Sequence, residues 1–581
     1  MKKTIYFFFI PAAAASLFSL SSCSKYEKEP KDWFTSELTF DSLDKNGIVA
    51  GYDLNNIYTY IPDGFTRVNG DYLDDAAGDA VPSLYNTQTE NFLKGIVTAT
   101  NNPEENTANG YGLTQWANSY YGIRRVNIFL KNIDKVPIVA ITKQYYRSEA
   151  KFLRALFYFE LLKRYGGVPL IGDAVFGLND NIELPRNTFA ETVDYIVNEC
   201  TAIKDSMRTD PVSTSDWGRA SKGAAVALKC RVLLYAASPL YNGGGFETDP
   251  VKKALTGYPT PDPNRWQKVV DAVNEFNALG TYYKLVTSGS PTAFASVFTT
   301  KMSSEIIFGK QVPNNSSLEF NQSPVGYVIS NQRCLGLTSP TQNLVDAFPM
   351  SNGLAINETG SGYNASSPYS NRDPRLDATV FRYGSQWLNR TVKTAEDSID
   401  KPNNYNIAPV QTRTGYYLRK FLGNFATSTA FSSQSHNFPI FRYAEILLTY
   451  AEALNELGQV ENAVTQIKTL RARAGIASGT SSRYGIKTGI TQSEMRDLIR
   501  NERHIELAFE EHRFWDIRRW KIADQVLSTA LTGVKILGNG TSLTYQPITV
   551  ATPAFQNRLY HMPIPYSEIT KNSKLIQNEG W

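Results

Sequence analysis

The sequence predicts a mostly α-helical protein, with paired helices forming a scaffold and long polar loops forming a second, irregular half. Three observations support this fold class. Amphipathic helical periods recur in two separate stretches of the chain, and segments rich in Ser, Asn, Thr, Gly and Tyr lie outside them. Capping boxes mark the starts of two helices. We expect the helix scaffold mainly in residues 111–280 and 440–525, and the loop-rich half mainly in residues 60–110 and 281–438.

The first helical stretch contains two long helices, expected over residues 112–134 and 142–166. The second of them is apolar nearly all round, which predicts a helix buried between its neighbours. Further helices are expected from Thr188 and over residues 218–238 and 264–280. Stacked antiparallel helix pairs are typical of tetratricopeptide proteins, but the period here is uneven and does not define the repeat by itself.

The second helical stretch begins with two helices over residues 441–458 and 459–475. Each ends on a glycine, Gly458 and Gly475, which is the residue favoured just past a helix C-terminus. A capping box that begins at Thr491 predicts a further helix.

Residues 1–22 have the features of a secretory signal peptide. Two lysines precede an apolar run of sixteen residues that ends at Leu20, and a membrane-spanning helix needs roughly 20. The segment LSSC that ends at Cys23 resembles a bacterial lipobox, in which the cysteine carries lipid. We therefore expect lipid on Cys23, a flexible tether over residues 23–40 and one domain over residues 41–581. An ordinary signal peptide with a chance cysteine is the alternative.

The composition excludes some classes of function. Without residues 1–22, the chain has 57 basic and 55 acidic residues, so no nucleic-acid footprint is expected. The histidines show no zinc-ligand spacing, no EF-hand spacing is present, and no cofactor is predicted. Cys200 and Cys230 fall on apolar helical stripes, which favours buried free thiols over a disulfide bridge between them.

Several long motifs resemble the SusD/RagB family of outer-membrane nutrient-binding lipoproteins. They occur in the family's order and span the chain nearly end to end. The matching segments are the lipobox at Cys23, RSEAKFLRALFYFELLKRYGGVPL, GRASKGAAVALKCRVLLYAASPLYN, RYAEILLTYAEALNELG, LRARAG, ERHIELAFEEHRFWDIRRWK and the closing MPIPYSEITKNSKLIQNEGW.

The resemblance implies a SusD-like α-α superhelical scaffold and a non-catalytic function. Members of this family bind a nutrient at the cell surface, most often an oligosaccharide and in some cases a peptide. They lie as a hinged lid on a SusC-type TonB-dependent transporter. The implied location is the outer membrane, with the lipid anchor on Cys23 and the protein facing the cell exterior; Ser24 after the cysteine is consistent with it.

The residues themselves predict a scaffold role for the charged motif and a binding role for the loops. Glu502, Glu506 and Glu510 recur every four residues among arginines, which favours a buried ion-pair network over acid–base chemistry. A sugar site needs aromatic platforms and planar hydrogen-bonding side chains. Candidates of these types lie in the polar loops: Asp74, Asp75, Asp79, Tyr85, Asn101, Asn102, Tyr327, Gln332, Arg333, Tyr363, Tyr369 and Trp387, with Tyr72 beside them.

Three rival functions stay open at this level. A surface glycosidase or protease lacks support, because the chain has no Gly-x-Ser-x-Gly, His-Glu-x-x-His or phosphate-loop motif. A scaffold that binds only proteins would not need long tyrosine-rich loops. A peptide-binding member of the same family is the strongest alternative, because polar loops with apolar pockets suit peptides as well as sugars.

Overall fold

The computed structural model describes residues 40–105, 114–287, 291–329, 331–403, 410–423, 436–540 and 542–581. The expected signal peptide, the lipid site Cys23 and the tether up to residue 39 lie outside the described residues. No helix within the described part is long and apolar enough to cross a membrane.

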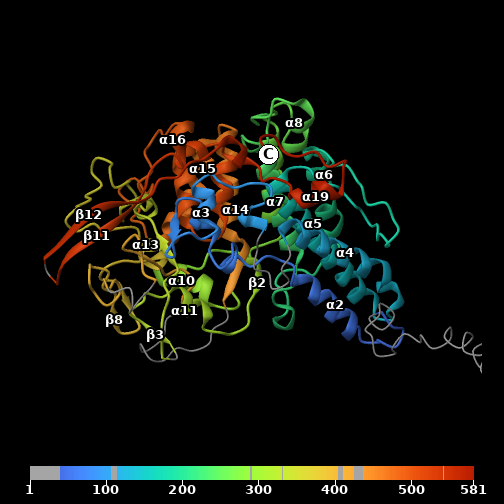
Figure 1. Cartoon of the computed structure of the whole chain (residues 1–581), viewed down its shortest axis with the longest axis horizontal. Helices are drawn as coiled ribbons and strands as arrows, with labels where there is room; N and C mark the ends of the chain where they lie inside the picture. The colour runs from blue at the N-terminus through green and yellow to red at the C-terminus, as the bar shows by residue number, and fades with distance from the viewer. Residues whose placement is uncertain are drawn as a thin grey trace, which may run out of the picture.

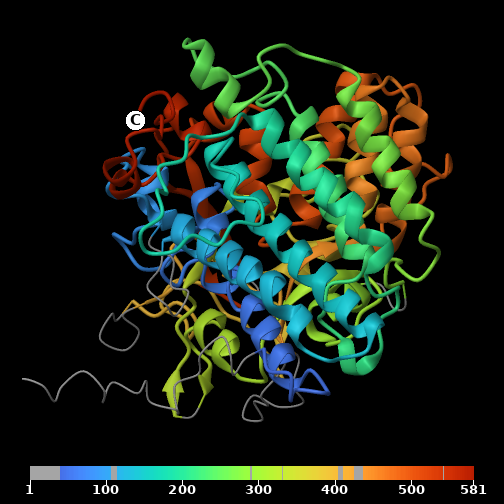
Figure 2. The same ribbon diagram turned by 90° about the vertical axis from the view of Figure 1, so that its right-hand side faces the viewer.

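The first helical stretch forms an array of neighbouring helices (Figures 1 and 2). In this array α4 packs on α5, α5 on α6, α6 on α7 and α7 on α9. The prediction of paired helices is confirmed in this part of the chain. The bounds are α2 (Ile48–Tyr58), α3 (Glu90–Leu93), α4 (Gln115–Asn132), α5 (Ala140–Tyr165), α6 (Phe189–Ile203), α7 (Lys222–Ala237), α8 (Pro250–Thr256) and α9 (Arg265–Asn277).

Local sequence explains where these helices begin and what they bury. The capping box at Thr188 is present, with both the hydroxyl and the Glu191 carboxylate bonded to backbone amides. Helix α5 is buried from Ser148 to its end, apart from one partly exposed lysine, as its all-round apolar sequence predicts. Trp116 and Trp266 are 5% and 8% exposed, so they pack in the core.

The second helical stretch packs against the first, because α14 contacts both α7 and α9. Gly458 and Gly475 both have positive φ (77° and 85°) at the ends of α14 and α15, as expected for residues that end a helix. The capping box at Thr491 is also present. The bounds are α14 (Tyr443–Glu456), α15 (Val460–Ala474), α16 (Gln492–Glu506), α17 (His512–Arg519), α18 (Ala523–Val526) and α19 (Tyr566–Lys571).

The segment between the two helical stretches contains only short elements, as predicted. Its strands form the two-stranded pairs β2–β10, β3–β4, β6–β9 and β7–β8, and β5 pairs with β1, which comes before α4 in the chain. Its helices are α10 (Pro291–Thr299), α11 (Ser317–Gln322), α12 (Gln342–Ala347) and α13 (Pro374–Thr379). The strands are β1 (Ala80–Pro82), β2 (Ile306–Gln311), β3 (Val328–Ile329), β4 (Gln332–Arg333), β5 (Thr338–Pro340), β6 (Val380–Phe381), β7 (Gln386–Trp387), β8 (Arg390–Thr391), β9 (Tyr417–Leu418) and β10 (Asn437–Arg442).

Two hydrophobic clusters underlie the two halves. The larger cluster joins the helices of both stretches, and the smaller lies beneath the loop-rich segment, where Phe294, Phe298 and Phe421 pack edge to face. Each half therefore has apolar support of its own. Cys200, Cys230 and Cys334 are buried free thiols, which confirms the preference for free thiols at the first two positions.

The elements that were not expected from the sequence include a helix and a hairpin. Helix α2 precedes the first predicted helix, and a long hairpin of β11 (Leu531–Asn539) and β12 (Ser542–Ala551) projects from one end of the molecule (Figure 1). The closing tail packs against the body of the protein. Arg186 donates to the carbonyl of Ile576 and to Asn578, and Trp581 donates to the carbonyl of Arg558.

Candidate functional site

The predicted binding residues do not all lie together, and half of them are buried. Asp74 and Asp75 have no exposed surface, and the exposed fraction of Asp79 is 2%. Asp74 accepts a hydrogen bond from the backbone amide of Phe509, and Asp79 lies 2.6 Å from His504 Nε2. Burial raises the pKa of Asp74 and Asp75 well above the ordinary value.

These three aspartates are therefore closed off from solvent, contrary to the expectation that they are exposed in a binding loop. For Asp74 and Asp79 the physical reason is that a polar loop can fold inward when its carboxyl groups meet backbone amides or buried side chains. Asn102 is also buried, and its side-chain oxygen accepts from the amide of Glu104. Tyr72, named beside them, has no exposed surface.

Tyr327 and Trp387 are core residues rather than platforms for a sugar. They are 2% and 3% exposed, and their rings pack edge to face with centroids 4.8 Å apart. Tyr327 donates to the carbonyl of Trp387, the indole of Trp387 donates to the carbonyl of Gly423, and Arg390 covers the Tyr327 ring. Both aromatic rings serve the smaller hydrophobic cluster.

Four of the predicted residues are well exposed. The ring of Tyr85 is 66% exposed, and the guanidinium of Arg413 lies 4.1 Å from its centroid. Asn101 is exposed on a turn, and Gln332 and Arg333 are exposed on β4. The Tyr85 ring therefore presents one face to solvent while a cation supports it.

Tyr363 and Tyr369 are partly exposed, and we group them with two tyrosines that were not predicted, the buried Tyr416 and the partly exposed Tyr545. We call Tyr363, Tyr369, Tyr416 and Tyr545 the tyrosine cluster. Tyr369 packs edge to face on both Tyr416 and Tyr545, with centroid distances of 6.2 and 5.8 Å. The hydroxyls of Tyr369 and Tyr416 are 3.0 Å apart.

Two arginines lie against rings of the tyrosine cluster. Arg382 lies 4.9 Å from the Tyr369 ring and pairs with Asp377 at 2.9 Å. Arg372 lies 5.8 Å from the Tyr363 ring and donates to the carbonyls of Val345 and Phe348, which fixes its position. The cluster thus combines aromatic faces, hydroxyls and a guanidinium in a prearranged group.

Two members of the tyrosine cluster were missed from the sequence. Tyr416 follows a turn in the loop-rich segment, and Tyr545 lies on β12 of the unexpected hairpin. A signal for that hairpin is present, because Asn539-Gly540 separates two stretches with alternating apolar residues. Tyr545 could therefore have been assigned to a strand, but its proximity to Tyr369 depends on the tertiary structure.

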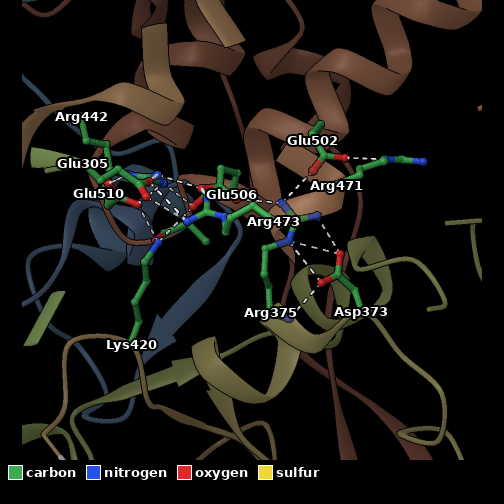
Figure 3. Close-up of polar contacts among 11 residues, drawn as sticks. Glu305, Asp373, Arg375, Lys420, Arg442, Arg471, Arg473, Glu502, Glu506 and Glu510 are labelled. Carbon is green, nitrogen blue, oxygen red and sulfur yellow. Dashed lines mark hydrogen bonds and ion pairs between the residues drawn. The ribbon is translucent and has the colours of Figure 1, made fainter. Parts of the chain in front are cut away.

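The charged motif forms the buried ion-pair network predicted for it (Figure 3). Arg442 pairs with Glu305 at 2.9 Å, with Glu506 at 2.8 Å and with Glu510 at 2.6 Å. Lys420 pairs with Glu510 at 2.7 Å. The labelled network has five cations and five carboxylates: Arg375, Arg442, Arg471, Arg473, Lys420, Glu305, Asp373, Glu502, Glu506 and Glu510.

This network joins the helix half to the loop-rich half. Arg375 on α13 pairs with Glu502 at 2.7 Å and with Glu506 at 2.8 Å, and both glutamates lie on α16. Burial alone would raise the pKa of Glu506, but Arg473, Arg442 and Arg375 together hold it well below the ordinary value. A carboxylate that stays ionised cannot donate a proton near neutral pH, so this cluster lacks a general acid at Glu506.

One buried carboxyl has the kind of pKa that catalytic acids have, but its position excludes that role in this structure. Burial raises the pKa of Glu104 to about 7, in spite of Arg67 at 3.2 Å. Its side chain has no exposed surface. Within the described residues there is also no group of three or more His, Cys, Asp or Glu side chains arranged to hold a metal ion.

Comparisons with known proteins match most of the chain. The model of the SusD family matches residues 304–581, and a second family model, described as starch-binding and associating with the outer membrane, matches residues 68–234. One SusD-like protein of Formosa agariphila is 24% identical over 544 residues, which cover 88% of this chain and 91% of the relative. Another is 40% identical over 145 residues, only 26% of its own length.

A solved structure of a SusD-like protein from Bacteroides fragilis is similar along nearly the whole chain. It is 29% identical, with a TM-score of 0.75, and the match covers 94% of this chain and 99% of that one. A structural match of this extent shows that the two proteins share their fold. The chain belongs to the SusD/RagB family.

Proposed function

We propose that this protein binds an oligosaccharide or polysaccharide without cleaving it, and delivers it to a SusC-type TonB-dependent transporter for import across the outer membrane. The family description as starch-binding and associating with the outer membrane supports glycan as the ligand class. The lipobox-like segment at Cys23 supports a lipid-anchored protein that faces the cell exterior.

The tyrosine cluster is the observation that carries the proposal. Sugars present flat faces of C–H groups and rims of hydroxyls, so they stack on aromatic rings and bond to planar polar groups. Tyr363, Tyr369 and Tyr545 are partly exposed, and Arg382 contributes a guanidinium beside them. We also propose contacts with the glycan outside the cluster, made by the exposed ring of Tyr85 and the side chains of Asn101, Gln332 and Arg333.

Calorimetric titration tests this function. The soluble mature chain, residues 24–581, is titrated with a panel of polysaccharides and with a parallel set of peptides, and each mixture is analysed for cleavage products. We expect binding to one class of glycan and no products. A response to peptides alone would favour the peptide-binding alternative, and product formation would favour a surface glycosidase.

The membrane anchor has a separate test. Replacing Cys23→Ala removes the sulfur that would carry lipid, so we expect the variant to leave the membrane fraction. Retention of the variant in that fraction after a high-salt wash would contradict the lipoprotein assignment. Co-purification with the transporter from cells, compared between the wild type and this variant, tests the partnership.

A further inference from the structure

A hollow lies away from the tyrosine cluster, where the end of α2 meets β2 and the turn before α7. Its volume is about 830 Å³. In Figure 1, α2 lies on the opposite side of the molecule from the β11–β12 hairpin, and β2 lies between them. We call it the β2 hollow, and its lining is Asn55, Tyr58, Thr59, Ile61, Ser215, Trp217, Gly218, Arg219, Gly309, Lys310 and Gln311.

The charged side chains that line the β2 hollow are all positive. The lining contains two cations, Arg219 and Lys310, and no carboxylate. The Lys310 ammonium donates to the carbonyl of Ile61 at 2.5 Å. Burial lowers the pKa of Lys310, against the opposing influence of Asp63. An anion beside the ammonium would therefore stabilise its charged form.

Arg219 is held in place by the buried Glu149 and the exposed Asn55, and its Nε also lies 3.6 Å from Asp216. Its guanidinium donates to Glu149 and to Asn55, both at 2.9 Å. Glu149 is 1% exposed and also accepts from the Tyr58 hydroxyl at 2.9 Å and pairs with Arg208. The walls of the β2 hollow are thus positioned before any ligand arrives, which lowers the ordering cost of binding.

The remaining walls carry the groups that recognise sugars. Trp217 brings a partly exposed indole, and Asn55 and Gln311 bring amides. Trp217 Nε1 and Gln311 Oε1 are buried atoms for which the described residues supply no hydrogen-bond partner. A hydroxylated ligand could supply both an acceptor and a donor. Gly218 lets the Gln311 side chain pack closely against the backbone of this wall, because a Cβ there would come within 2.7 Å of it.

We infer that the β2 hollow is a second saccharide site, selective for a sugar unit that carries a carboxylate. Lys310 and Arg219 face the carboxylate, Trp217 packs against the ring, and Asn55 and Gln311 bond to its hydroxyls. This inference rests on the proposed glycan binding but concerns a different place on the molecule. It assigns the natural ligand to the class of glycans that contain uronic acids.

The test compares charged and neutral forms of one sugar chain on the mature protein. The probes are an oligomer of galacturonic acid, its methyl ester and an alginate oligomer, each titrated by calorimetry. We expect at least one of the two acids to bind and, for the galacturonate, the ester to bind about tenfold more weakly. Lack of binding by both acids, or equal affinity for galacturonate and ester, would overturn the inference.

Variants locate the site. Lys310→Met should weaken binding of the acid about tenfold and leave neutral glycans unaffected. Ser215 is exposed on the rim, so Ser215→Glu should fold normally and repel the acid; Thr214→Glu places the same charge on an exposed residue outside the lining. Unchanged affinity for the acid in both Lys310→Met and Ser215→Glu would refute the assignment.

The outcomes separate this inference from the proposed function. Binding of neutral glycans that depends on Tyr545, together with no response to either acid, would refute the β2 hollow alone. Binding of the acid that depends on Lys310, with no response to neutral glycans, would support the β2 hollow and weaken the role of the tyrosine cluster. Absence of binding to every glycan would refute both.

Discussion

The ion-pair network and the tyrosine cluster use arginine in opposite ways. In the network, Arg442 and Arg375 are buried and each pairs with several carboxylates, so their charges are balanced by ion pairs inside the fold. In the cluster, Arg382 lies beside an aromatic ring and remains partly exposed. Density of charge in the sequence therefore marks the scaffold of this protein, whereas the proposed binding surface, the tyrosine cluster, is assembled from aromatic residues dispersed along the chain.

The comparison also explains why the two halves can differ so much in regularity. The loop-rich half has few long elements, yet Asp373, Arg375 and Lys420 anchor it to α16 and to the segment that follows it. Buried ion pairs require precise geometry, because each charge loses its hydration on burial. A loop that supplies one partner of such a pair is held as firmly as a helix would be.

The largest expected effect follows from removing one charge of the network. Glu506→Gln leaves Arg442, Arg473 and Arg375 with one carboxylate fewer in the interior. We expect the free energy of unfolding to fall by about 3–5 kcal/mol, measured by chemical denaturation. The matched control is Glu461→Gln, whose carboxylate is 64% exposed and pairs with Arg483; its loss should cost about 0–1 kcal/mol. Equal losses of unfolding free energy in Glu506→Gln and Glu461→Gln would contradict the expectation that removing a carboxylate costs more from a buried ion pair than from an exposed one.

Because of Glu506, the stability of the protein should also depend on pH. The pKa of Glu506 lies well below 4.5 in the folded protein, so between these values the unfolded chain binds more protons than the folded chain. The stability that this group contributes is complete above about pH 4.5 and decreases as the pH falls toward the folded pKa. Thermal melting of the wild type and Glu506→Gln should therefore converge in acid. A gap that widens in acid would contradict the depressed pKa.

A smaller effect is expected on the binding surface. Tyr363→Ala and Tyr545→Ala each remove a partly exposed ring, so glycan affinity should fall about tenfold while the melting temperature changes little. Calorimetry with the glycan identified in the panel measures this. Tyr566→Ala is the control, because that ring is 55% exposed on α19, outside the cluster. A similar loss in the control would argue against a defined site.

The smallest expected effect concerns a helix start. Thr491→Ala removes the hydroxyl that accepts from the amide of Glu494, and should lower the free energy of unfolding by about 1 kcal/mol. Thr465→Ala, within α15, removes an exposed threonine that caps nothing and should be close to neutral. Denaturant titration of both variants measures how much one local capping bond contributes to the free energy of unfolding, and this value is compared with the loss caused by Glu506→Gln. A Thr491→Ala effect as large as that of Glu506→Gln would mean that local capping matters as much as the network.

Much of the helix scaffold could be predicted because its signals are local. The capping boxes at Thr188 and Thr491 and the glycines at 458 and 475 act on backbone groups within one turn. The binding residues could not be predicted in the same way. Asp74 and Tyr85 lie in the same polar segment, but one is fully buried and the other is 66% exposed.

His504 and His512 illustrate the limit of periodicity. The sequence places them eight residues apart on one expected helix, whereas the chain leaves the helix at Leu507 and begins α17 at His512. Phe509 and Glu511 have positive φ in this break, which lets the backbone amide of Phe509 reach Asp74. That contact spans more than 400 residues of sequence, so no local pattern could report it.

By itself, the sequence determined the helix pairs, the capping residues, the free thiols and the scaffold role of the Glu502–Glu510 motif, because helical period and capping depend on neighbours along the chain. Only the tertiary structure decided which loop residues face solvent. It brought Tyr545 beside Tyr369, and it placed Lys310 and Trp217 around one hollow. The exposure of a loop side chain and its distance from other side chains depend on how distant segments pack. Such packing produces no periodic pattern in a single sequence.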